Sequence, residues 1–143
     1  MHREYGILIH PSSLPGPHGI GDLGSETYRF VDWLASVGAG LWQILPLVPP
    51  GAGNSPYSTW SAYAGNPALI SLDALSEIGL LPPTKPFGND GHTRVDFEQV
   101  TAFKSERLVF AAKTLLSEPE NPLYLQYQTF VRQNAWVRDA ATF

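Results

Sequence analysis

The residues best suited to chemistry lie in one loop, Gly53–Pro67. Its aromatic side chains, Tyr57, Trp60 and Tyr63, offer flat apolar faces that suit the C–H surfaces of sugar rings. The same loop supplies short polar groups that can bond sugar hydroxyls, namely Asn54, Ser55 and Asn66. This combination favours carbohydrate binding, although a packed surface loop can have the same composition.

Paired carboxylates for glycosidic chemistry cannot be picked out. The chain has 13 acidic residues, and most of them fall at helix caps or on helical faces. In the loops that would face a ligand there is only Asp22. We expect these acids to be solvated or to cap helices.

A literal G-x-G-x-x-G spans Gly19–Gly24, between a predicted strand and a predicted helix. In a dinucleotide site the first glycine follows the strand directly, and an acidic residue ends the second strand. Here the motif begins well after Ile9, and Leu41–Leu47 contains no acid. The pattern favours a tight glycine-rich turn over a nucleotide site.

Histidine and cysteine give little sign of a metal site or cofactor. The chain has no Cys and four His, at positions 2, 10, 18 and 92, so neither a thiolate site nor a helical i, i+4 pair is available. His10 ends the first predicted strand, where barrel enzymes place functional residues. With no acid or nucleophile near it in the sequence, a structural role is favoured. We predict no metal and no cofactor.

Composition and charge exclude several classes of partner. The chain has 143 residues, 43% hydrophobic and 15% charged, as expected of a globular domain. The net charge of −4 comes without a basic stripe, which argues against nucleic acid and anionic membranes. Its N-terminal apolar run, Gly6–Ile9, is too short for a signal peptide or a membrane span. We expect the protein to stay where it is made, in the cytoplasm. The oligomeric state is not predicted.

The elements that must position the loop are read from apolar periodicity. Tyr5–Ile9 and Leu41–Leu45 are predicted strands, and between them a helix starts with Ser25 as N-cap and stops at Gly38. Strand, helix and strand in this order indicate a βαβ unit of an α/β fold. The loop 46–67 then follows the second strand, on the face where α/β sheets bind ligands.

Further along, the pattern becomes helical. Leu69–Leu72 is a brief strand-like segment, and residues 73–78 are one or two helical turns. A helix is predicted from about Asp96 to Pro119, and one last helical segment from Pro122 to Phe143. Two strands cannot bury the faces of so many helices. We therefore expect a truncated chain that exposes apolar surface and folds poorly alone.

Several motifs, in order and spacing, resemble the amylomaltase or 4-α-glucanotransferase family. The resemblance is dense over residues 5–81 and looser from Asp96 onward. It rests on Gly6–Gly24, Phe30–Leu34, Trp42–Leu47, Ser55–Tyr57, Ala64–Pro67 and Leu69–Leu72, with Asn134–Trp136 and Asp139 in family-like places.

The resemblance implies an α/β fold, the N-terminal portion of an interrupted (β/α)8 TIM barrel that is incomplete in this chain. It further implies a division into three parts. Residues 1–81 would be the first βα units with the sugar-binding loop. Residues 82–95 would be a Pro/Gly-rich linker, and residues 96–143 a helical inserted subdomain, truncated at its C-terminal end.

The same resemblance implies glucan transfer by a retaining mechanism, with an Asp nucleophile and a Glu acid/base. These acids lie on later barrel strands beyond Phe143, so no catalytic residue is assigned and the isolated chain is expected to be inactive. Ser55 and Tyr57 match residues that line the donor side of the cleavage site. Substrates would be maltodextrin or starch-type α-1,4-glucans.

Two departures and two alternatives accompany this interpretation. Asn54 replaces a frequent Asp, and Ala52 replaces a Tyr that some bacterial members use at a remote glucan site. The second change puts that remote site in doubt. A stand-alone carbohydrate-binding module without catalysis remains the alternative function. A plastid, with its targeting segment absent from this chain, remains the alternative location.

Overall fold

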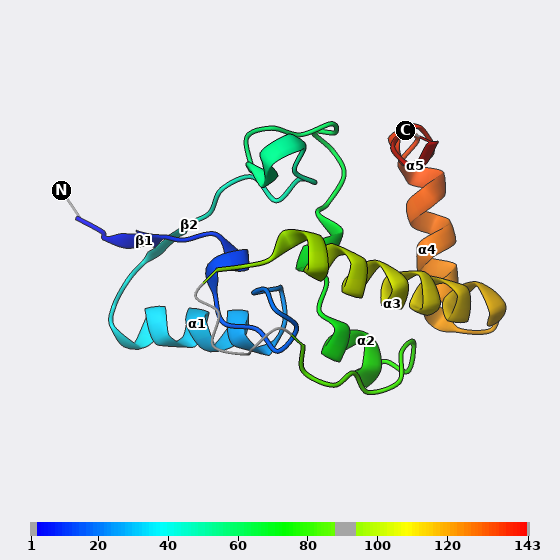
Figure 1. Cartoon of the computed structure of the whole chain (residues 1–143), viewed down its shortest axis with the longest axis horizontal. Helices are drawn as coiled ribbons and strands as arrows, with labels where there is room; N and C mark the ends of the chain where they lie inside the picture. The colour runs from blue at the N-terminus through cyan, green and yellow to red at the C-terminus, as the bar shows by residue number, and fades with distance from the viewer. Residues whose placement is uncertain (1–2, 88–93, 143) are drawn as a thin grey trace.

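A two-stranded parallel sheet and the helix that joins its strands form the N-terminal end of the chain (Figure 1). The computed structural model describes residues 3–87 and 94–142. Strand β1 (Gly6–Leu8) pairs with β2 (Leu41–Gln43), and α1 (Ser25–Ser36) connects them. This arrangement confirms the predicted βαβ unit, with strands shorter than the apolar runs.

The start of α1 differs from the prediction. Ser25 is the first helical residue and Gly24 is the N-cap, without a side-chain cap bond. Instead, Asp22 Oδ1 accepts a bond from the Gly24 amide at 3.0 Å, and Thr27 Oγ1 donates to the Asp22 carbonyl at 2.6 Å. The carboxylate therefore organises the turn before the helix. The predicted stop is confirmed, because Gly38 has a left-handed φ of 76°.

The strand predicted over Leu69–Leu72 is wrong. That segment holds the end of a 3-10 helix, η3 (Pro67–Leu69), and the start of α2 (Leu72–Glu77). Asn66 accepts a bond from the Ala68 amide and Ser71 accepts one from the Ala74 amide. Two consecutive side-chain caps thus satisfy the backbone locally, and the apolar run does not need a strand partner.

Three helices follow in the C-terminal part of the described chain. Helix α3 (Phe97–Ser117) begins directly after its N-cap Asp96, close to the predicted start, and α4 (Pro122–Gln133) and α5 (Trp136–Thr142) follow. The single helix predicted from Pro122 to Phe143 is wrong, because α4 ends before Asn134 and α5 begins after it. The Asn134 side-chain amide donates to the Phe130 carbonyl at 2.8 Å. Phe143 and linker residues 88–93 lie outside the described residues.

The best-buried apolar side chains lie under α3, away from the sheet. Ile20 from the first loop, Leu69 and Leu72 around α2, and Val100 of α3 are at most 3% exposed. At the sheet, in contrast, Leu8 and Leu41 are more than half exposed. The long helix α3 thus packs against η3, α2 and α4 (Figure 1). In the part of the chain described, no helix is long and apolar enough to cross a membrane.

Candidate functional site

The loop after β2 is held in shape by its own backbone. Its two ends are joined where the Asn66 amide donates to the Leu47 carbonyl at 2.9 Å. Within it, the Gly51 amide donates to the Ser58 carbonyl, and the Ser58 amide donates to the Ser55 carbonyl at 3.1 Å. A turn closed on itself in this way presents its tip to solvent.

Ser55 and Tyr57 occupy that tip. The Ser55 hydroxyl oxygen accepts a bond from the Tyr57 amide at 3.3 Å, which links the two residues directly. Tyr57 is 74% exposed, and Pro56 between them fixes one backbone torsion. A tyrosine ring this open is not a core residue, so both its face and its hydroxyl are available to a ligand.

The two N-terminal loops meet beside this tip. A hollow of about 190 Å³ is lined by His10 and Ser12 from the first loop and by Asn54, Pro56 and Asn66 from the second. Asn54 itself has a positive φ of 55°, as Asn tolerates. The arrangement brings residues of both loops together at the carboxyl ends of β1 and β2, as the βαβ topology predicts.

His10 shapes the first loop. Its Nδ1 lies 2.7 Å from the Ser12 hydroxyl and accepts the Ser12 amide at 3.2 Å, which caps the 3-10 helix η1 (Pro11–Ser13). Burial lowers the pKa of His10, and the Pro46 carbonyl opposes the shift. The structural role favoured from the sequence agrees with these contacts.

The glycines of the G-x-G-x-x-G stretch are explained by close packing. A Cβ on Gly21 would collide with the Pro11 carbonyl oxygen, and one on Gly24 would lie 2.6 Å from the Ser71 hydroxyl. Backbone and side chains of the protein fill the space that a phosphate would need in a nucleotide loop. This agrees with the predicted tight turn.

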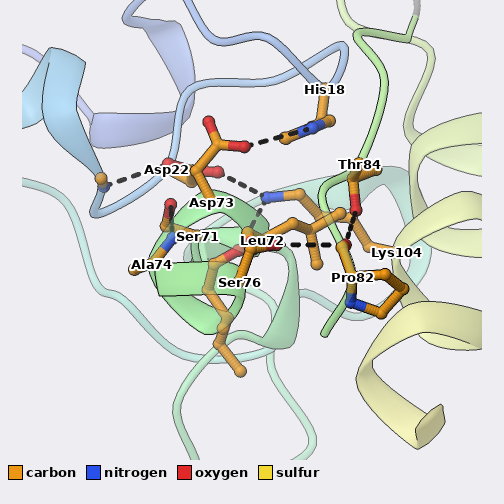
Figure 2. Close-up of polar contacts among 12 residues, drawn as sticks. His18, Asp22, Ser71, Leu72, Asp73, Ala74, Ser76, Pro82, Thr84 and Lys104 are labelled. Atoms are coloured by element: carbon orange, nitrogen blue, oxygen red, sulfur yellow. Dashed lines mark hydrogen bonds and ion pairs between the residues drawn. The ribbon is translucent and has the colours of Figure 1, made fainter. Parts of the chain in front are cut away.

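A buried ion pair that was not predicted from the sequence joins the first loop to α3 (Figure 2). Lys104 Nζ is 2.9 Å from Asp22 Oδ2, and the two side chains are only 1% and 6% exposed. The ammonium also donates to the carbonyls of Ala68 at 2.7 Å and Ile70 at 2.9 Å. Burial lowers the pKa of Lys104, and the Asp22 charge opposes this. Asp22 is therefore engaged in structure and does not face a ligand.

His18 is a second buried polar group near this pair. It is fully buried, and its Nε2 lies 3.8 Å from Asp73 Oδ1 (Figure 2). Its ring stacks on Phe103 at a centroid distance of 6.0 Å. Burial lowers the pKa of His18, which the nearby Asp73 carboxylate opposes. A neutral imidazole in this position serves packing.

Among the described residues, the two loops contain neither a metal-binding cluster nor a pair of acidic side chains. Among residues 3–87 and 94–142, no group of three or more His, Cys, Asp or Glu is arranged to hold a metal ion. The site as built can bind a neutral polar ligand through aromatic faces, hydroxyls and amides. No described residue of these loops combines exposure with an acidic side chain.

Comparison with known proteins gives a consistent answer. The family model described as 4-alpha-glucanotransferase matches residues 9–143. The chain is 46% identical to a 4-alpha-glucanotransferase of Synechocystis sp., over 99% of this chain and 28% of the relative. It is also 46% identical to the chloroplastic/amyloplastic 4-alpha-glucanotransferase of Solanum tuberosum, over 99% of this chain and 26% of the relative.

A solved structure extends the likeness to three dimensions. The amylomaltase from Streptococcus agalactiae, in complex with acarbose, superposes with a TM-score of 0.87 at 36% identity, covering 98% of this chain and 28% of that one. This chain thus spans about a quarter of the length of the relatives it matches. The family predicted from the motifs is confirmed: the chain belongs to the 4-alpha-glucanotransferase family.

Proposed function

We propose that this sequence supplies the donor-side sugar-binding wall of a 4-α-glucanotransferase. The enzyme would transfer a segment of an α-1,4-glucan to glucose or another glucan by a retaining mechanism. The observation that carries the proposal is the Ser55-Pro56-Tyr57 tip beyond the carboxyl end of β2, with the Tyr57 ring exposed and Ser55 bonded to the Tyr57 amide, in a chain of this family. Tyr57 would stack on the donor sugar next to the scissile bond, and Ser55 would contact a hydroxyl.

The proposed architecture is the first part of an interrupted (β/α)8 barrel. The parallel pair β1–β2, with α1 between the strands, supports it because barrels are built from such units. The exposed Leu8 and Leu41 are suited to contact with further barrel elements. The proposed divisions are the first βα units at residues 1–81, a Pro/Gly-rich linker at residues 82–95 and a helical inserted subdomain at residues 96–143.

The catalytic acids of the proposed reaction would lie outside these 143 residues. Retaining transfer needs a carboxylate nucleophile and an acid/base residue. Asp22, the one acid of the first loop, is paired with Lys104. Ser55 and Tyr57 would therefore bind and orient the glucan without taking part in bond cleavage. The proposed substrates are maltodextrins and starch-type glucans, and the proposed location is the cytoplasm or, as in the Solanum tuberosum relative, a plastid.

Two proteins test the function together. The 143-residue chain and the protein expressed from its complete reading frame are each incubated with maltotriose, and glucose and longer maltodextrins are measured. We expect turnover on the order of 1 s⁻¹ or more from the complete reading frame and none from the chain alone. Turnover by the chain alone would contradict the absence of catalytic acids. Maltodextrin binding by the complete product without any turnover would favour a stand-alone binding module.

A further inference from the structure

A second hollow lies between the loop after β2 and α5, the last helix described. It has a volume of about 260 Å³. It is lined by Trp60, Ser61 and Tyr63 from the loop and by Trp136, Asp139 and Ala140 from α5. The rings of Tyr63 and Trp136 face each other at a centroid distance of 6.0 Å, tilted by 31°. Segments remote in sequence thus meet in one aromatic cradle.

The walls of this cradle are fixed before any ligand arrives. The Trp136 indole N–H donates to Asn134 Oδ1 at 3.3 Å, and Phe130 packs edge-on against the same ring at 6.2 Å. On the loop side, the Ser61 hydroxyl oxygen accepts the amides of Tyr63 at 3.3 Å and Ala64 at 3.1 Å. A site with fixed walls loses little conformational entropy on binding.

The groups around the cradle match one class of ligand. Tyr63, at 75% exposed, and Trp60, at 51%, keep open aromatic faces for the C–H surface of a sugar. The exposed Asp139 carboxylate can accept bonds from hydroxyl groups, and charged acceptors make the stronger hydrogen bonds. An anionic ligand would be repelled by Asp139, and no basic side chain lines the hollow.

We propose that this hollow is an accessory subsite for glucosyl units of the α-1,4-glucan, separate from the Ser55–Tyr57 tip. The inference rests on the proposed function, because the loop that presents Tyr57 also provides Trp60 and Tyr63. A glucan held at Tyr57 reaches the accessory subsite only when it is long enough. The accessory subsite therefore contributes to the binding of long glucans and not of short ones.

The test compares glucans of two lengths on the protein expressed from its complete reading frame. The kcat/KM values for maltoheptaose and maltotriose are measured for the wild type, Trp136→Ala and Tyr63→Ala. The control is Tyr28→Ala, an equally open aromatic on α1. We expect the maltoheptaose-to-maltotriose ratio to fall at least about fivefold in both cradle variants, the worth of an aromatic contact, and to stay unchanged in the control.

The outcomes separate this inference from the proposed function. An unchanged ratio in Tyr63→Ala would overturn the accessory subsite while leaving glucan transfer intact. If the wild type has no activity, the proposed function fails. Calorimetric titration with maltoheptaose then tests the accessory subsite directly, with weaker binding by Tyr63→Ala expected and equal binding overturning it.

Discussion

Replacing Lys104 by Met is the sharpest test of how the two loops are held together. The ammonium of Lys104 bonds Asp22 Oδ2 and the carbonyls of Ala68 and Ile70, all within 2.9 Å. Asp22 belongs to the first loop, whereas Ala68 and Ile70 follow directly on the loop that carries Tyr57. One side chain of α3 thus fastens both loops. Met keeps the length of the side chain and removes all three bonds.

The expected cost follows from burial. An exposed ion pair would contribute about 0–1 kcal/mol, but Lys104 and Asp22 are 1% and 6% exposed. Lys104→Met leaves the Asp22 carboxylate buried without its counter-charge, and removal of one partner of a buried pair costs about 3–5 kcal/mol. Replacing both charges, in Lys104→Met with Asp22→Asn, removes the stranded carboxylate. The double variant should therefore be more stable than Lys104→Met alone.

The assay is the free energy of unfolding by urea, measured on the protein expressed from its complete reading frame. Lys113→Met is the matched control, because Lys113 lies on the same helix with an exposed side chain. It should change the free energy by less than about 0.5 kcal/mol. A loss of under about 1 kcal/mol in Lys104→Met would refute this reasoning, since it is the value of a solvent-screened surface pair.

Two further predictions concern Tyr57 and His18. Tyr57→Ala should lower kcat/KM by more than tenfold, about 1.4 kcal/mol in the barrier, at an almost unchanged melting temperature because the side chain is 74% exposed. A destabilised variant with normal kinetics would remove Tyr57 from the site. For His18, burial lowers the folded-state pKa below 6.5, and the like charge of Lys104 on α3 lowers it further. The carboxylates of Asp73 on α2 and of Asp22, with the Thr84 backbone, oppose this shift without reversing it. The unfolded chain therefore takes up the proton first, and stability should fall as the pH drops below about 6.5. His18→Leu should flatten that profile in urea titrations at pH 5 and 7, with a residual slope from His10, whose pKa shifts the same way. An unaltered slope would contradict the prediction.

The sequence was sufficient for those parts of the fold that local rules govern. Apolar runs with β-forming residues predicted β1 and β2, and the helix between them followed from periodicity and Gly38. The same rules misled where local hydrogen bonds outweighed propensity. Asn66 and Ser71 turn an apolar stretch into a 3-10 helix and a helix start, and Asn134 divides the last helix. Each error involves a short polar side chain that bonds nearby backbone.

The candidate site divides in the same way. Ser55 and Tyr57 lie in a loop after a predicted strand, so their shared place beyond the carboxyl end of β2 could be anticipated from sequence and topology together. Contacts between distant segments could not, because nothing in the residues near Trp136 specifies that its ring meets Tyr63.

Lys104 illustrates both the limit and the signal that was available. It shares one face of α3 with Val100 and Ala111, both buried. A lysine within an apolar stripe must either extend its amine to solvent or find a buried partner, since an unpaired charge in the interior is too costly. Asp22, the lone acid of a loop otherwise made of apolar, small and imidazole side chains, was the available partner. The periodicity of one helix and the composition of one loop could thus have suggested the pair, although only the fold brings them within 2.9 Å.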